Sequence, residues 1–450
     1  MSVQTSKDRL HNYLRFCFQK SQSFGAFCKQ FSASCFVTIP KENTFIKHAG
    51  FFDKVAKKLL LSSLAKMHHA GLIIEENGEQ IILGNSRANL QGKVIISNPK
   101  TYVKLLLAGS IGASEAYIQG WWSSPDLTKV VQVLAREQAV CDDLDSGFWK
   151  IAMFPSWLYH KFHKNTQAGS KNNILAHYDI GNEMYAQFLD KEMLYSSAIY
   201  PNKKADLEEA QLYKLKMICQ RLDLKKGETL LEIGTGWGAL ATYAAQHYGV
   251  HVTTTTISDA QYDYSAERIK SLGLEKQITL LKKDYRELSG QFYKLVSIEM
   301  IEAVGHEYLS SFFTACNKHL KADGKMLIQA ITISDQRYTQ YRKGVDFIQR
   351  YIFPGGCLPS INVMSNNLTD KTDMVITALH DIGQDYARTL QHWSQRFERA
   401  NREIKRLGYG DDFIRLWQFY FSYCEGAFLE RNISTVHLIA TKPGYRDATR

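Results

Sequence analysis

The fold is decided by a short stretch near the middle of the chain, Thr229-Leu-Leu-Glu-Ile-Gly-Thr-Gly-Trp-Gly238. Residues 229–233 predict a buried strand, and the pattern of residues 239–248 predicts a helix directly after the glycines. Glycine lets the backbone turn tightly there and lets a ligand approach the main chain closely. A turn that serves only packing is the alternative to a ligand-binding turn.

The residues around this stretch alternate between helix and strand patterns. Further strands are predicted at 251–257, 277–281, 294–298 and 325–333, and further helices at 260–272 and 307–320. Asp206 is predicted to cap another helix, whose apolar face carries Leu207, Leu212, Leu215, Ile218 and Leu222. This alternation predicts an α/β fold in which helices cover both faces of a parallel sheet.

The glycine turn is more typical of a site for S-adenosylmethionine than of one for NAD. The pattern Gly234-x-Gly236-x-x-Ala239 by itself also fits a loose dinucleotide fingerprint. However, Glu232 stands two residues before the first glycine, where a carboxylate can bind an ammonium group. The next strand ends in Thr256-Ile-Ser-Asp-Ala-Gln261, and no acidic residue stands at its end to hold the ribose of NAD.

The composition is that of a globular protein rather than a disordered or fibrous one. The chain has 450 residues, of which 45% are hydrophobic and 22% charged, so two or three domains are expected. No apolar run approaches the roughly 18–20 residues that a membrane span needs. The N-terminal residues show neither an apolar core nor a cleavage site, so we expect no signal peptide and a cytoplasmic protein.

The charge balance favours an anionic partner. Lys and Arg number 55 against 45 Asp and Glu, which gives a net charge of +10. This excess suits nucleic acid, a phospholipid surface or an acidic small molecule, and composition does not choose among them. The eight cysteines are scattered without a C-x-x-C pair, and His68-His69 lacks a third ligand. We therefore expect neither a disulfide scaffold nor a metal site.

Residues 1–165 are expected to form a smaller N-terminal α+β accessory domain, and residues 166–450 the main domain. A strand is predicted at 93–97 and helices between 101 and 137, whereas residues 75–86 are predicted to be rich in turns. Residues 149–164 are basic and aromatic, which suits contact with a lipid surface or, alternatively, packing as a linker helix. A second basic run, residues 396–406, is interleaved with Glu and is expected to be a solvated helix face.

Further motifs, in a fixed order, carry a resemblance to a known family. They are Ala176-His-Tyr-Asp-Ile-Gly-Asn182, Leu194-Tyr-Ser-Ser197, the glycine turn, Thr256-Ile-Ser258 with Gln261, Met300-Ile-Glu-Ala-Val-Gly305 and Tyr351-Ile-Phe-Pro-Gly-Gly-Cys-Leu-Pro-Ser360. With these motifs the protein resembles cyclopropane-fatty-acyl-phospholipid synthases, which are grouped with the mycolic acid cyclopropane synthases among S-adenosylmethionine-dependent methyltransferases. Residues 112–122 are similar to part of the accessory domain of longer members.

The resemblance implies a Rossmann-like class I methyltransferase fold, with a mixed, mostly parallel seven-stranded sheet and helices on both faces. It implies an enzyme that transfers a methylene unit from S-adenosylmethionine to the cis double bond of unsaturated phospholipid acyl chains, which forms cyclopropane fatty acids. The expected enzyme is peripheral on the inner face of the membrane. Its N-terminal domain would contact lipid or form a homodimer.

The resemblance also implies a base, bound bicarbonate, that removes a proton from the new methyl group so that the ring can close. Glu302, Tyr386 and main-chain atoms of Ile331 match the groups that hold it. Two positions depart from the family, because this protein has Ser197 where Cys is usual and Gln329 where His is usual. Ser197 keeps its main-chain N–H and Gln329 a neutral donor and acceptor, but Gln329 cannot relay a proton at neutral pH. Ring closure and simple methyl transfer both stay open.

The resemblance assigns the remaining site residues to the cofactor and the acyl substrate. Cofactor contacts are expected from Tyr195, Ser196, Glu232, Gly234, Gly236, Gly238, Thr256, Ile257 and Gln261. Asp284 and Tyr285 follow the third strand, where Asp284 would accept a hydrogen bond from the adenine amino group while Tyr285 stacks or packs. His177 and Tyr185 match positions that line the acyl pocket, although each would also fit a structural role.

Several alternatives remain open. They are a fatty-acyl C-methyltransferase without ring closure, an N-methyltransferase of small amines, and a protein that binds lipid or S-adenosylmethionine without catalysis. An amine needs only a base and a small pocket, whereas a lipid needs an open hydrophobic channel. A nucleic-acid methyltransferase would explain the positive charge, but the sequence has no Asn-Pro-Pro-Tyr-type base-flipping motif, so we expect no nucleic-acid partner.

Overall fold

The computed structural model describes residues 49–141 and 180–446, all of which belong to one compact unit, Ile46–Arg450. The expected domain boundary at residue 165, the basic aromatic stretch 149–164 and His177 lie outside the described residues. Among the described residues, no helix has both the length and the apolar character that crossing a membrane requires.

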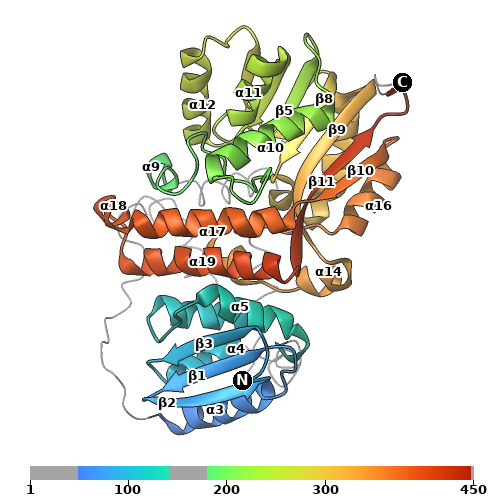
Figure 1. The fold of residues 1–450 in the computed structure, drawn as a ribbon. Coiled ribbons are helices and arrows are strands. Elements are labelled where there is room, and N and C mark those ends of the chain that lie inside the picture. The colour runs from blue at the N-terminus through green and yellow to red at the C-terminus, as the bar shows by residue number, and fades with distance from the viewer. Residues whose placement is uncertain (1–48, 142–179, 447–450) are drawn as a thin grey trace, which may run out of the picture. The chain divides into compact units, whose positions relative to one another are not determined.

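A seven-stranded sheet forms the centre of the larger part (Figure 1). Its order is β10-β11-β9-β8-β5-β6-β7. The strands are β5 (Thr229–Ile233), β6 (His251–Thr256), β7 (Ile278–Lys282), β8 (Phe292–Ile298), β9 (Leu320–Ile333), β10 (Val375–Asp381) and β11 (Ile433–Thr441). Strands β5 to β9 run parallel, whereas β11 is antiparallel to both β9 and β10. The mixed, mostly parallel seven-stranded sheet that the resemblance implies is confirmed.

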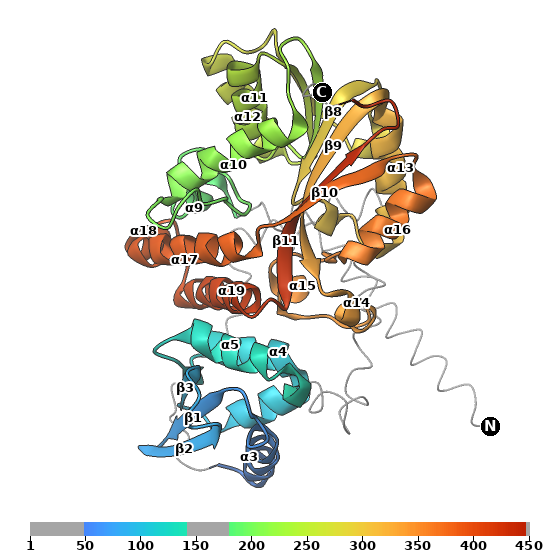
Figure 2. The same ribbon diagram turned by 45° about the vertical axis from the view of Figure 1, so that its right-hand side comes forward.

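Helices cover both faces of this sheet, which Figure 2 shows with α10, α11 and α12 on one side and α13 and α16 on the other. These helices are α10 (Leu207–Leu222), α11 (Ala239–Tyr248), α12 (Asp259–Ser271), α13 (Leu309–His319) and α16 (Ile361–Lys371). The side chain of Asp206 accepts a hydrogen bond from the main-chain N–H of Glu209 and caps α10, as predicted. Leu212 was placed wrongly on the buried face of α10, because its side chain is exposed.

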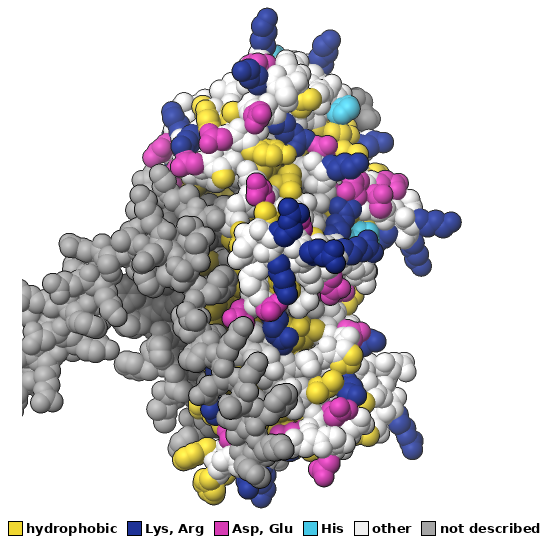
Figure 3. All heavy atoms as spheres, turned by 90° about the vertical axis from the view of Figure 1, so that its left-hand side faces the viewer, with side chains coloured by type: hydrophobic (Ala, Val, Ile, Leu, Met, Phe, Trp, Pro, Cys, Tyr) yellow, Lys and Arg dark blue, Asp and Glu magenta, His cyan; other side chains and the backbone are white. Residues whose placement is uncertain are grey.

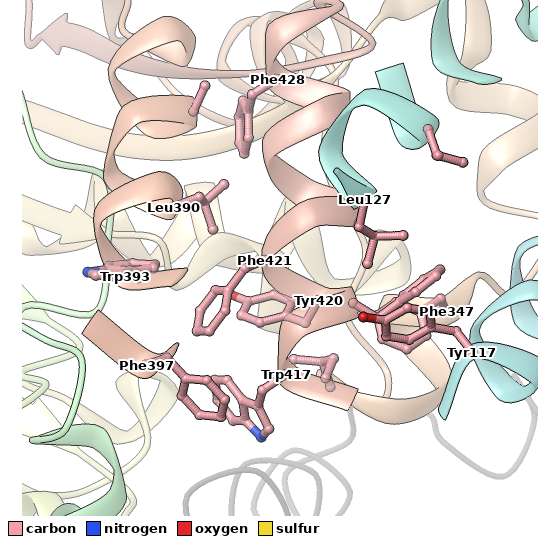
Figure 4. Close-up of a cluster of buried hydrophobic side chains, with 14 of the residues drawn as sticks. Tyr117, Leu127, Phe347, Leu390, Trp393, Phe397, Trp417, Tyr420, Phe421 and Phe428 are labelled. Atoms are coloured by element: carbon pink, nitrogen blue, oxygen red, sulfur yellow. The ribbon is translucent and has the colours of Figure 1, made fainter. Parts of the chain in front are cut away.

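Two helices between β10 and β11 form an aromatic layer that the sequence analysis did not anticipate. They are α17 (Gly383–Arg399) and α19 (Asp411–Leu429), joined through the short α18 (Asn401–Arg406). Trp393, Phe397, Trp417 and Phe421 are fully buried between them (Figure 4). The rings of Phe397 and Trp417 stack with their centroids 6.1 Å apart. The layer lies against the site described below, because Tyr386 of α17 and Tyr420 of α19 both line its cavity.

The basic run of residues 396–406 is part of α17 and α18. Figure 3 shows Lys and Arg side chains on one face of the molecule with Asp and Glu side chains among them. Arg396 pairs with Glu208 and Arg406 with Glu403, where the Nη1–Oε2 distance is 2.8 Å. The expectation of a solvated helix face with interleaved acids is therefore confirmed for Arg406, whereas Arg396 is half-buried and pairs with Glu208 of another helix.

The N-terminal part has its own four-stranded sheet, in the order β2-β1-β3-β4. Its elements are α3 (Phe51–Leu64), β1 (Gly71–Glu76), β2 (Glu79–Gly84), β3 (Gln91–Ile96), α4 (Lys100–Ile118), β4 (Trp122–Ser123) and α5 (Leu127–Arg136). The prediction that residues 75–86 are rich in turns was wrong, because β1 and β2 form an antiparallel hairpin there. Its turn is Asn77-Gly78, with φ of 54° and 83°, which matches the right-handed twist of the two strands.

Hydrogen bonds and close packing hold helix α5 against α19. Arg136 makes two hydrogen bonds to the carboxylate of Glu430, of 2.8 and 2.9 Å, and Thr128 donates one of 3.0 Å to Glu425. Gly426 stands where a Cβ atom would lie only 2.7 Å from the side chain of Val131. This close approach requires a residue without a side chain on α19.

We expect Phe397→Ala to lower the free energy of unfolding by about 3–5 kcal/mol, because it leaves a cavity among large rings that have no room to collapse. Leu212→Ala is the matched control on an exposed helix position, with an expected change of roughly 0.5 kcal/mol or less. Urea unfolding of both variants measures the difference. Equal effects of the two substitutions would contradict the aromatic layer as a stabilising core.

Candidate active site

A cavity of about 1450 Å³ opens at the carboxyl ends of the central strands. Parallel strands present their carboxyl ends at one edge of the sheet, which is where open α/β sheets bind their ligands. Glu232 and Gly234 reach it from the end of β5, Glu299 and Glu302 from the residues after β8, and Ile331 from β9. The cavity therefore collects residues that lie about a hundred positions apart in the sequence.

The glycine turn forms one wall of the cavity. Gly234 has a φ of 96° and Gly236 a φ of 54°, which is a left-handed conformation that other residues adopt only with strain. Gly234 and Gly236 line the cavity, whereas Gly238 caps the start of α11. Main-chain atoms are thus exposed to a ligand at this turn, as expected for a cofactor site.

Glu232 is a buried carboxylate that faces the cavity with one hydrogen bond. The hydroxyl of Thr254 donates to its Oε2 at 2.6 Å, and no ion pair of the described residues includes it. Burial raises the pKa of Glu232 to about 8. A buried carboxylate is costly unless a cation pairs with it, so the ammonium end of S-adenosylmethionine fits this position.

The other expected cofactor residues are drawn together around the same cavity. Those that line it are Tyr195, Ser196, Glu232, Gly234, Gly236, Thr256, Ile257, Gln261, Asp284 and Tyr285. The hydroxyl of Thr256 donates to Oε1 of Gln261 at 2.9 Å and orients the amide. Arg286 binds both carboxylate oxygens of Asp284, at 2.8 and 2.6 Å, which fixes that carboxylate at the cavity wall.

The stretch Tyr195-Ser-Ser197 begins at the cavity wall, which Tyr195 and Ser196 line, and ends at Ser197, which is fully buried and does not line the cavity. The ammonium group of the fully buried Lys214 donates to Oγ of Ser196 at 2.7 Å. The hydroxyl of Tyr195 donates to that of Tyr420 at 3.1 Å. Ser197 points its main-chain N–H at a carboxylate that the sequence analysis did not consider, that of Glu299.

Glu299 accepts hydrogen bonds from three of the groups that were expected to surround a bicarbonate. Its Oε1 accepts from the N–H of Ser197 at 2.9 Å and from Nε2 of Gln329 at 2.7 Å. Its Oε2 accepts from the hydroxyl of Tyr386 at 2.8 Å. The signal was present in the sequence, because Ser297-Ile-Glu-Met-Ile-Glu302 carries two carboxylates directly after a strand, but only the second was considered.

A series of hydrogen bonds orients the amide of Gln329. Arg221 donates to Nδ1 of His437 at 2.6 Å, so the ring proton of the neutral imidazole is on Nε2. Nε2 then donates to Oε1 of Gln329 at 2.8 Å, which turns the amide nitrogen toward Glu299. Burial lowers the pKa of His437 well below its ordinary value, and the charge of Arg221 lowers it further, so the ring stays neutral.

Glu302 has one satisfied and one unsatisfied oxygen. Its Oε1 accepts from the main-chain N–H of Ile331 at 2.5 Å, whereas its buried Oε2 has no hydrogen-bond partner among the described residues. Burial, and then the neighbouring charge of Glu299, raise the pKa of Glu302 to about 8. Glu302 is therefore protonated at neutral pH.

Of the two residues matched to the acyl pocket, only Tyr185 is described. It is fully buried among aromatic rings, with Trp237 at 5.3 Å and Tyr195 at 5.2 Å between centroids. It is not among the residues that line the cavity. Tyr185 thus supports Tyr195, which does line it.

Comparison with known proteins gives consistent matches. The family model for mycolic acid cyclopropane synthetase matches residues 164–438. The chain is 33% identical to the cyclopropane-fatty-acyl-phospholipid synthase of Escherichia coli over 429 residues, which are 91% of this chain and 97% of that protein. It is 35% identical over 333 residues to the tuberculostearic acid methyltransferase UfaA1 of Mycobacterium tuberculosis, covering 71% of this chain and 76% of that one.

Solved structures show the same fold. The crystal structure of mycolic acid cyclopropane synthase CmaA1, complexed with SAH and CTAB, has a TM-score of 0.57 at 27% identity. It covers 60% of this chain and 98% of its own. The cyclopropane synthase MmaA2 from Mycobacterium tuberculosis has a TM-score of 0.56 at 27% identity, with the same coverage.

We expect Glu232→Gln to weaken S-adenosylmethionine binding about 10- to 100-fold, because the amide cannot form the charge-assisted hydrogen bond to the ammonium group. Isothermal titration calorimetry measures the change in the dissociation constant. Glu275→Gln, on the exposed end of the loop before β7, is the matched control and should bind as the wild type does. Unchanged binding by Glu232→Gln would remove Glu232 from the cofactor site.

The same carboxyl predicts how the stability of the ligand-free protein depends on pH. Its ordinary pKa is 4.5, and burial raises it to about 8 in the folded state. Folding therefore takes up a proton between these values, and the contribution of Glu232 to stability is lost as the pH rises through this window. The stability of Glu232→Gln relative to wild type should accordingly increase from about pH 5 to about pH 8. Urea unfolding at several pH values measures this difference, and a difference that does not change with pH would contradict the prediction.

Proposed function

Because the chain belongs to the mycolic acid cyclopropane synthetase family of S-adenosylmethionine-dependent methyltransferases, we propose that its substrate is an unsaturated phospholipid. In this proposal a methylene unit passes from S-adenosylmethionine to the cis double bond of an acyl chain and forms a cyclopropane fatty acid. The observation that carries the proposal is the cavity, which continues from the glycine turn into an apolar region large enough for an acyl chain.

The size and lining of the cavity support a lipid substrate. Its volume of about 1450 Å³ exceeds the roughly 300–1,000 Å³ of a pocket for one small ligand, so cofactor and a second molecule fit together. Aliphatic side chains from the N-terminal part line the far region, namely Leu60, Leu64, Ile74, Leu105, Val130 and Leu134. A small amine would need neither this length nor this apolar wall. We therefore propose that the N-terminal part of the expected two-domain protein helps to hold the acyl chain.

The chemistry of the reaction explains the aromatic side chains that line the cavity. A carbon–carbon double bond is a weak nucleophile, so the site must hold it against the sulfonium methyl group and exclude water. S-Adenosylmethionine supplies the methyl group when it is bound. A carbocation then develops on the substrate, and the faces of aromatic rings stabilise cations. Tyr195, Phe353 and Tyr420 line the cavity and offer such faces.

Helix α3 supports a placement at the membrane surface. Phe51 and Phe52 are 76% and 78% exposed, and Val55 and Leu59 extend the apolar side chains along the helix. Lys54 and Lys58 are also exposed on α3 and would attract anionic headgroups. We propose that this helix touches the lipid surface. The alternative occupant of its exposed face is a second copy of the protein in a homodimer, as expected from the resemblance.

A second product is favoured by one comparison. The chain is 35% identical to a tuberculostearic acid methyltransferase over 71% of its length, so a methyl or methylene branch without ring closure is the alternative outcome. Both outcomes begin with the same methyl transfer. They differ in whether the carbocation then closes to a ring or gives a methyl or methylene branch. Gln329 in place of the usual His is compatible with either.

We expect purified protein incubated with S-adenosylmethionine and vesicles of monounsaturated phospholipid to add one methylene unit to the acyl chains. Mass spectrometry measures the gain, and proton NMR distinguishes upfield ring protons from exomethylene signals. Vesicles of saturated phospholipid are the control and should gain nothing, because they offer no double bond. Absence of product, while S-adenosylmethionine still binds, would contradict the proposed function and direct attention to amine substrates.

A further inference from the structure

We infer that Glu299 is the base of the reaction, a carboxylate built into the protein at the position where the resemblance led us to expect a bound bicarbonate. The inference rests on the proposed function and names the group that takes the proton. It assigns catalysis to a residue that no sequence motif used above contains.

The first argument is that the donors of the site are already engaged. Ser197, Gln329 and Tyr386 direct one donor each at the two oxygens of Glu299, at distances between 2.7 and 2.9 Å. A free anion of similar shape would need the same three donors. With Glu299 in place they hold a protein carboxylate, and no further carboxylate-like anion is required there.

The second argument is that Glu299 faces the reacting groups. It lines the same cavity as Glu232 and Gly234 on the cofactor side and Leu390 and Phe428 on the apolar side. A carboxylate that only stabilised the fold would point away from a ligand cavity. Here the proton acceptor lines the cavity that the methyl donor and the acyl chain would share.

The third argument is electrostatic, because the two neighbouring carboxyls have different surroundings. Glu302, whose Oε2 has no partner in the described part of the chain, has a pKa of about 8 and stays neutral. Burial also raises the pKa of Glu299, but the N–H of Ser197, the amide of Gln329, the charge of Lys214 and the hydroxyl of Tyr386 oppose this rise. The hydrogen bonds and the charge around Glu299 favour its ionised form more than the surroundings of Glu302 do. Carboxyls whose environments move their pKa values apart are typical of an acid–base site.

The fourth argument is the backbone of Glu299. Its φ is 47°, in the left-handed region that favours glycine, and its N–H donates to the main-chain oxygen of Gln329 at 2.8 Å. A residue with a side chain is strained in this conformation, which costs free energy. Residues with such backbone strain are found mainly at functional sites. Glycine would relieve this strain, so the presence of Glu at this position indicates that the carboxylate itself is needed.

The step balances without a further reagent. The double bond attacks the sulfonium methyl group, the carbon–sulfur bond breaks with its electrons on sulfur, and the substrate becomes a carbocation. Glu299 then takes a proton from the new methyl group, and the electron pair of that C–H bond forms the last bond of the ring. The neutral carboxyl afterwards releases the proton to water. If a hydride first shifts to the carbocation, loss of a proton from the new methyl group to Glu299 gives an exomethylene product instead of a ring.

Two variants test the inference in the full-length protein, with bicarbonate removed from the buffer or added back. Glu299→Gln fills the same space and keeps an acceptor for Ser197 and Gln329, but it cannot take a proton. Glu299→Gly removes the carboxylate, is compatible with the positive φ, and opens a space beside the same three donors. Calorimetric binding of S-adenosylmethionine shows that each variant is folded.

We expect wild-type turnover to change less than about twofold when bicarbonate is removed, and both variants to lose about 10²- to 10⁴-fold, as expected for loss of a general base. Added bicarbonate should restore at least about tenfold to Glu299→Gly and nothing to Glu299→Gln, whose side chain fills the space. Wild-type activity that depends on bicarbonate, or a variant with wild-type activity, would overturn the inference.

A binding measurement separates this inference from the proposed function. Carbon-13 NMR of labelled bicarbonate should show binding to Glu299→Gly and none to the wild type. Bicarbonate bound at the wild-type site would overturn the inference whatever the substrate is. Absence of lipid product from the wild type, with the NMR result as expected, would overturn the proposed function alone.

Discussion

The cavity depends on how the fold accommodates the three carboxyls Glu232, Glu299 and Glu302, which stand at the ends of β5 and β8. An unpaired charge buried in a protein costs several kcal/mol, so each carboxyl must be paired, hydrogen-bonded or neutral. Glu299 is hydrogen-bonded by three donors, and Glu302 is neutral. Glu232 has one hydroxyl partner and fits a cationic ligand. Each of the three carboxyls is thus stabilised in a different way.

The elements that supply these donors explain the unusual parts of the fold. Tyr386 belongs to α17, which stands on the aromatic layer with α19, and stacks on Phe428 with centroids 4.6 Å apart. His437 belongs to β11, the antiparallel strand that follows α19, and reaches Gln329 across the sheet. The helical insertion between β10 and β11 therefore both walls the cavity and aims its donors.

Much of the fold could be predicted because its signals are local. The strand, glycine turn and helix around Gly234 need only neighbouring residues, and the strands β5 to β9 were placed within a few residues. Strands β10 and β11 and the pair α17 and α19 were not anticipated, because their pairing joins residues far apart in the sequence. The hairpin around Asn77-Gly78 was missed although its turn signal was local.

The sequence by itself determined the type of fold, the cofactor turn and most of the residues that line the cavity, because each depends on a short motif. The tertiary structure alone decided which carboxylate receives the hydrogen bonds of the site. Glu299 and Glu302 are three residues apart and equivalent as letters, yet only Glu299 meets donors from Ser197, Gln329 and Tyr386. Those donors come from three distant segments, and hydrogen bonds across such distances exist only once the sheet and the aromatic layer have packed.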